Sequence, residues 1–102
     1  MMMSVAHPLF ADATKRITDA SILRLLGHPV RLKILMTLDM GECNVKNIWE
    51  CLGMEQCVVS QHLAVLKKHD IITGRRRGAE IIYTIAHPLA QRIVAAIAAQ
   101  NR

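Results

Sequence analysis

Apolar residues recur at helical spacing along most of this chain. They predict a first helix over about 11–26, whose inward stripe includes Ile17 and Leu23. Gly27 interrupts this pattern. Pro29 suits the first position of a second helix that ends near Met40.

Two further helices are predicted on either side of a glycine turn. Asn44 fits the N-cap of a short helix that ends at Gly53, and a longer helix runs over Glu55–His69. The longer helix has an apolar stripe and a polar or small outer face. We place His62 on the apolar stripe, and not as a base contact or metal ligand. The inward residues are Val59, His62, Leu63 and Leu66, and the outer residues are Gln56, Cys57, Ser60, Gln61 and Ala64.

Two apolar segments of strand character follow and indicate a β-hairpin over about 71–85. A basic tip, Gly74–Glu80, separates them and carries Arg75, Arg76 and Arg77. Pro88 then opens a last helix over about 88–100. We expect its apolar stripe to consist of Leu89, Ile93, Ala96 and Ile97, with alanines keeping the rest narrow.

The arrangement of these elements is that of a winged helix-turn-helix. The helix-turn-helix covers about 44–69 and the wing about 71–85. The predicted fold class is therefore mainly α with a β-hairpin: four helices, the hairpin and a fifth helix. A basic hairpin behind a polar reading helix suits contact with double-stranded DNA.

Composition adds an expected oligomeric state. The 102 residues fit one domain, 1–102, and 52% of them are apolar but only 3% aromatic. So small and aliphatic a chain exposes much apolar surface unless a partner covers it. We therefore expect a homodimer formed by the helices at about 11–26 and 88–100.

Charge and cysteine content suggest the partner and the compartment. The formal net charge of +5 favours an anionic partner such as nucleic acid. No apolar stretch is long enough to span a membrane, and Met1–Phe10 lacks the layout of a signal peptide. Three cysteines, an odd number, fit a reducing compartment. We expect a cytoplasmic protein with no membrane partner.

Three stretches in the right order resemble the ArsR/SmtB family of repressors. They are Gly27–Leu35 (GHPVRLKIL), Val59–Leu66 (VSQHLAVL) and Arg75–Tyr83 (RRRGAEIIY), within a match over about Ser21–Ile97. The resemblance implies a homodimer through the first and last helices that represses transcription from an inverted-repeat operator. It also implies release from DNA when a signal arrives.

Candidate DNA contacts follow from the reading helix and the wing. Gln56 and Gln61 suit base readout, because a side-chain amide pairs with adenine through a donor and an acceptor. Cys57 and Ser60 share that face, and Ser60 suits a base or a phosphate. The three wing arginines suit phosphate or a narrow minor groove. Lys67 and Lys68 fit either DNA contact or the helix dipole.

The metal sites usual in this family are not intact. The Cys-x-Cys positions hold Asn44 and Lys46, and the last helix offers only His87 among the usual ligands. Met36 stands where relatives that sense persulfide carry a cysteine. We therefore expect no cofactor. A thiol sensor, by oxidation or soft-metal binding, remains open at Cys43, Cys51 and Cys57, and we expect Cys57 to face the DNA.

Two alternatives remain beside a sensing repressor. The first is a DNA-binding regulator of the same fold that responds to no ligand; the inducer, if one exists, is not specified by the residues. The second is a small enzyme or an RNA-binding module. No nucleophile with its base, phosphate-binding glycine loop or paired carboxylates stands out, so an enzyme is not expected. RNA readers use exposed aromatics, whereas the only aromatics of this chain are Phe10, Trp49 and Tyr83, and we expect at least two of them in the core.

Overall fold

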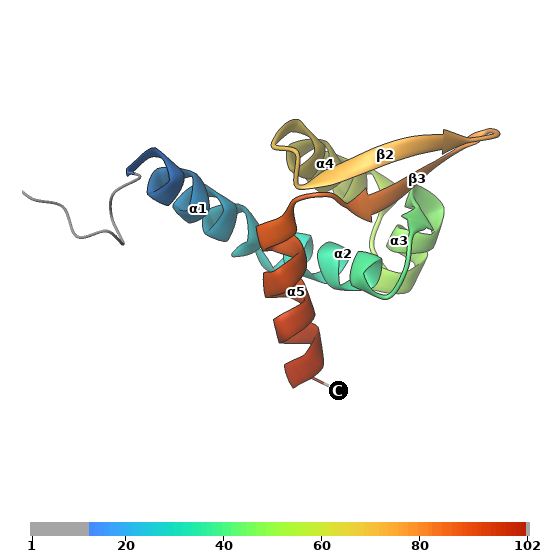
Figure 1. Cartoon of the computed structure of the whole chain (residues 1–102). Coiled ribbons are helices and arrows are strands. Elements are labelled where there is room, and N and C mark those ends of the chain that lie inside the picture. Colours follow the sequence, from blue (N-terminus) through green and yellow to red (C-terminus); the bar gives the residue numbers. More distant parts are fainter. Residues whose placement is uncertain (1–12, 102) are drawn as a thin grey trace, which may run out of the picture.

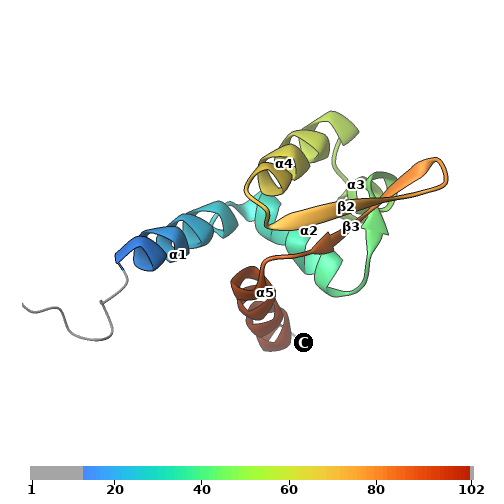
Figure 2. The ribbon, with the colours of Figure 1, turned by 45° about the horizontal axis from the view of Figure 1, so that its top comes forward.

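The computed structural model describes residues 13–101, with side chains from residue 19 onward. Helices α1 and α5 extend away from a body made of the other elements, and the β2–β3 hairpin projects past α3 in both views (Figures 1 and 2). The elements are α1 (Ala13–Leu26), α2 (Pro29–Asp39), β1 (Cys43–Asn44), α3 (Val45–Leu52), α4 (Gln56–Lys68), β2 (Ile72–Arg77), β3 (Glu80–Ile85) and α5 (Pro88–Gln100). The first two positions of the predicted first helix lie outside the described residues.

Local capping chemistry sets the helix boundaries. Proline occupies the start of α2 and of α5, and in each case the preceding histidine caps the helix: Nδ1 of His28 accepts the Val30 N–H at 3.1 Å. Asn44 is confirmed as the N-cap of α3, where its Oδ1 accepts the Asn47 N–H at 2.8 Å. Gly53 ends α3 with φ of 65°, a conformation that glycine adopts without steric cost.

The core is built from aliphatic side chains, as the shortage of aromatic residues requires. Helix α2 is central to it and contacts all four other helices. The largest completely buried side chains come from five elements, α2, α3, α4, β2 and α5, and from the loop before β2, so one cluster holds these elements together. They are Ile34, Leu35, Ile48, Val59, Leu66, Ile71, Ile72 and Val94.

The sheet has three antiparallel strands in the order β1-β3-β2. Strand β1 was not predicted; its two residues pair with β3, Cys43 opposite Tyr83. The predicted wing is confirmed, but its expected tip is wrong. Strand pairing continues to Arg77 opposite Glu80, so the three arginines lie within β2 and the turn is shorter than expected.

Gly74 is part of β2 for a steric reason. It lies opposite Tyr83, and a Cβ built on it would be 3.1 Å from Cε1 of that ring and 3.0 Å from Cγ2 of Ile81. The missing side chain lets the tyrosine ring cover the strand. The sequence analysis placed Gly74 in the turn of the hairpin, but its role is to allow close packing within the sheet.

The inward face of α5 differs from the predicted one. Ala90, Val94 and Ala98 are buried, whereas Ala96 is exposed. The larger members of the predicted stripe remain half-buried: Leu89, Ile93 and Ile97. Helical spacing identifies two adjacent apolar stripes on this helix but does not say which one faces the core. The narrower stripe does so because small side chains allow close approach to α2, which α5 contacts.

His62 lies on the inward side of α4, as predicted. Its half-buried ring packs against His28, with ring centroids 4.6 Å apart and planes tilted by 51°. Burial lowers the pKa of His62 below the ordinary value, and the nearby positive groups of His28 and Arg31 lower it further. The neutral imidazole is therefore the form that this contact favours.

We expect the His62 contact to weaken in acid. The folded-state pKa lies below the unfolded one, so its contribution is present above the ordinary histidine pKa of about 6.5 and is lost as the pH falls through the folded value. Urea unfolding at pH 7.5 and 5.0, at one protein concentration, measures the loss. His62→Leu should lose less stability over this range than the wild-type chain. Equal losses would contradict the prediction.

Candidate DNA-binding surface

Helices α3 and α4 form the helix-turn-helix. Ile48 anchors α3 in the core, and Val59, Leu63 and Leu66 anchor α4. The turn between the helices is tied back by the Met54 N–H, which donates to the carbonyl of Trp49 at 3.1 Å. The orientation of α4 is therefore set by buried contacts on one side, which leaves its other side open.

The exposed side of α4 carries the side chains that the sequence analysis proposed for DNA contact. Gln56, Cys57, Ser60, Gln61 and Ala64 are all exposed. No aspartate or glutamate lies within α4, and both basic residues of its last turn are lysines. A polar helix face without acidic groups is suited to a polyanion.

A hollow of about 220 Å³ lies between α3, α4 and β3. Ser60, Ala64 and Lys67 line it from α4, while Val45 and Tyr83 line it from α3 and β3. Lys67 also lines a second hollow beside the start of β2. Lys68 lines neither hollow. Lys67 therefore borders the junction of α4 with β2 and β3.

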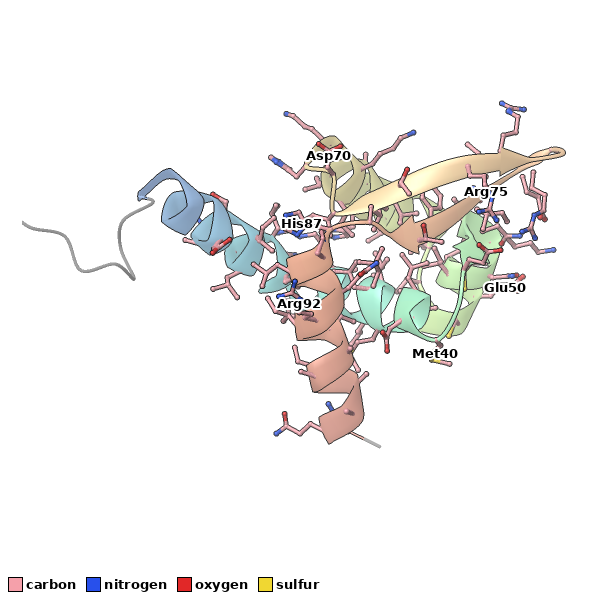
Figure 3. All side chains as sticks on the ribbon, in the orientation of Figure 1. Met40, Glu50, Asp70, Arg75, His87 and Arg92 are labelled. Atoms are coloured by element: carbon pink, nitrogen blue, oxygen red, sulfur yellow. The ribbon has the colours of Figure 1, made fainter. Side chains whose placement is uncertain are left out.

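The three wing arginines do not share one environment. Arg75 and Arg77 are alternate residues of β2, and both bond to Glu42. Nη2 of Arg75 lies 3.0 Å from Oε2 of Glu42, and Nη2 of Arg77 lies 2.7 Å from Oε1. Arg76 points to the opposite face of the strand and forms no ion pair within the described part of the chain. Figure 3 shows Arg75 on the hairpin, at the end of the molecule that holds α3.

Glu42 was not identified from the sequence. It lies more than thirty positions before the arginines, in the segment between α2 and β1, and no local pattern connects them. The hydrogen bond from Arg77, together with the charge and hydrogen bond of Arg75, lowers the pKa of Glu42. A second contact ties the same region together: Nδ2 of Asn44 donates to Oε1 of Glu80 at 2.9 Å.

The three cysteines occupy different surroundings. Cys43 is half-buried, and its Sγ donates to the Gly41 carbonyl at 3.5 Å. Burial, with a smaller effect from Cys51, raises the pKa of the Cys43 thiol, which disfavours the reactive thiolate there. Cys51 and Cys57 are exposed, and the Cys57 thiol donates to the carboxylate of Glu55 at 3.6 Å.

The described residues hold neither a candidate metal cluster nor a candidate membrane span. Within residues 13–101, no three or more His, Cys, Asp and Glu side chains are grouped to hold a metal ion. No helix in that range combines the length and apolar character of a membrane span.

Comparison with known proteins places the chain among bacterial regulators. Residues 28–73 match the family described as bacterial regulatory proteins of the arsR family. The transcriptional repressor SmtB of Mycobacterium tuberculosis is 37% identical over 91 residues, which cover 86% of this chain and 67% of that protein. The biofilm growth-associated repressor of Xylella fastidiosa is 35% identical over 95 residues, which cover 92% and 83% of the two chains.

Solved structures show the same fold. The repressor PagR of Bacillus anthracis superposes with a TM-score of 0.78 at 32% identity, over 84% of this chain and 99% of that one. The repressor BigR of Xylella fastidiosa gives 0.77 at 34% identity, over 89% and 95%. A homodimeric winged helix-turn-helix DNA-binding domain from Mycobacterium bovis gives 0.76 at 27% identity, over 97% and 90%. The chain belongs to the ArsR family of winged helix-turn-helix transcriptional repressors.

Proposed function

We propose that this repressor binds an inverted-repeat operator as a homodimer, with α4 in the major groove and the wing on the backbone. The observation that carries the proposal is the exposed, acid-free face of α4 beside a strand with three arginines. Two symmetric reading helices would meet half-sites about one helical turn apart, roughly 34 Å. The names and family of the relatives are those of regulators and not of enzymes.

The dimer is supported by the apolar surface of the two projecting helices. Leu23 was expected on the inward stripe of α1, but it is 56% exposed, and its neighbour Ile22 is buried instead. Ile93 and Ile97 on α5 are only half-buried. Both helices extend from the body and contact each other (Figure 2). The Mycobacterium bovis neighbour, which has the same fold, is homodimeric. A second copy of this surface would remove these side chains from water.

We expect Leu23→Asp to disrupt the dimer. Fully burying a leucine stabilises by about 1.5–3 kcal/mol, and Leu23 is 56% exposed, so about half of this gain remains for each copy in the interface. A symmetric interface has two copies, so the dissociation constant should rise at least about tenfold. Analytical ultracentrifugation measures the mass. Met40→Asp is the control, because Met40 is 80% exposed at the end of α2, away from α1 (Figure 3). A wild-type chain that sediments as a monomer at micromolar concentration would refute the dimer.

Base readout is assigned to Gln56 and Gln61, with Ser60 between them. All three side chains are exposed on the same helix face. Each glutamine amide offers a donor and an acceptor, the pattern that adenine presents in the major groove. Ser60 also lines the hollow beside the wing, which suits a phosphate next to the bases being read.

Replacing Gln61 with alanine should reduce discrimination more than overall affinity. Loss of one bidentate contact costs about 1–3 kcal/mol at one base pair and leaves phosphate contacts unchanged. Selection from a randomised duplex library, with each variant, reveals the preferred half-site and its tolerance. Gln61→Ala should accept substitutions at one position per half-site. If affinities for selected and random duplexes fall equally, Gln61 does not read a base.

The wing arginines are proposed to contact the DNA backbone. Changing Arg75, Arg76 and Arg77 together to alanine should weaken binding to every sequence. It should also make the slope of log affinity against log salt concentration shallower, by up to about three units. Fluorescence anisotropy with a labelled duplex between 50 and 300 mM salt gives the slope. An unchanged slope would remove the wing from the interface.

Regulation of DNA binding by a cysteine thiol stays a prediction. Cys57 fits it best of the three cysteines, because it is exposed in the first turn of α4 among the reading side chains. Oxidation there would add bulk and charge to the DNA-facing surface. The alternative, a regulator that senses nothing, uses the same DNA contacts. RNA binding is less favoured, since Tyr83 is buried and Trp49 is half-buried against the core; Phe10 lies outside the described residues.

A further inference from the structure

Glu42 holds a position that no described side chain shares: it bonds two guanidinium groups of the wing. Its two carboxylate oxygens accept from Arg75 at 3.0 and 3.1 Å, and one of them accepts from Arg77 at 2.7 Å. The Glu42 side chain is 38% exposed, while those of Arg75 and Arg77 are 56% and 60% exposed. The cluster therefore lies at the surface, where another anion can reach it.

The carboxylate of Glu80, also on the hairpin, bonds to Asn44 and not to the arginines. Glu80 lies across the strands from Arg77, but its Oε1 accepts the amide of Asn44. Arg76 is on the other face of β2, so it does not share Glu42. One carboxylate thus partly neutralises two of the three wing arginines.

We propose that Glu42 is an internal competitor of DNA phosphate for Arg75 and Arg77. This inference rests on the proposed contact between the wing and DNA. A carboxylate and a phosphate use the same guanidinium donors, so a phosphate at this face must displace or share Glu42. Glu42 therefore lowers affinity for DNA of any sequence. It also reduces the number of counterions that the wing releases on binding.

The test compares charge-matched variants on a labelled 30-base-pair duplex of random sequence. Glu42→Gln should bind about 3- to 10-fold more tightly than wild type at 100 mM salt. Its salt slope should be steeper by about one unit. Glu50→Gln adds the same charge on α3, where Glu50 is exposed and forms no ion pair within the described residues. It should change affinity less than about twofold.

Glu42→Asp separates geometry from net charge. It keeps the carboxylate but shortens it, so the bonds to both arginines cannot be kept at their present lengths. We expect an affinity between those of wild type and Glu42→Gln. In a chain that already carries Arg75→Ala and Arg77→Ala, Glu42→Gln should have no more effect than Glu50→Gln, because the groups it competes for are gone.

Several outcomes would overturn the inference. They are a Glu42→Gln affinity no higher than that of Glu50→Gln, a loss of affinity, or a gain that persists without the two arginines. A loss of affinity would mean that Glu42 positions the arginines for DNA. These results differ from failure of the proposed function, in which the triple alanine variant leaves the salt slope unchanged. Circular dichroism melting checks that each variant is folded.

Discussion

The burial of Val59, Leu63 and Leu66 is the constraint on which the rest of the molecule depends. These three side chains fix the rotation of α4 about its own axis, because each has a place in the common aliphatic core. The same rotation turns the glutamines and Ser60 outward. The face of α4 that we propose for DNA contact is therefore set by buried contacts on the other side of the helix. A rotation of α4 by one residue would expose apolar side chains on that face.

Charged residues are distributed unevenly over the surface, which the net charge of +5 alone does not show. The outer face of α4 is polar but nearly uncharged, and the cations gather at its last turn and along β2. Glu42 then moderates part of that basic strand. In the proposed complex, sequence reading by α4 and backbone attraction by the wing are thus separated in space.

What the sequence could predict depended on the range of the interaction. Capping and turn residues act over a few positions, so Asn44, Gly53 and Pro88 marked their helices correctly. The outward face of α4 followed from its spacing. Strand β1 has two residues and exists only because β3 lies beside it, which no local pattern reveals. The link from Glu42 to the arginines and the choice of stripe on α5 are likewise tertiary. The roles of the surface residues in DNA contact remain predictions.

The packing of Gly74 beneath Tyr83 has a consequence for how this hairpin can vary. Even a methyl group at position 74 would crowd the aromatic ring of Tyr83, so this part of the hairpin accepts little change in sequence. Its far end, between Arg77 and Glu80, is exposed and joined by a short connection. Insertions and deletions are tolerated at exposed turns of this kind. The hairpin can therefore differ in length among homologues beyond Gly74. Such changes would alter how far it reaches along a duplex without disturbing the helices.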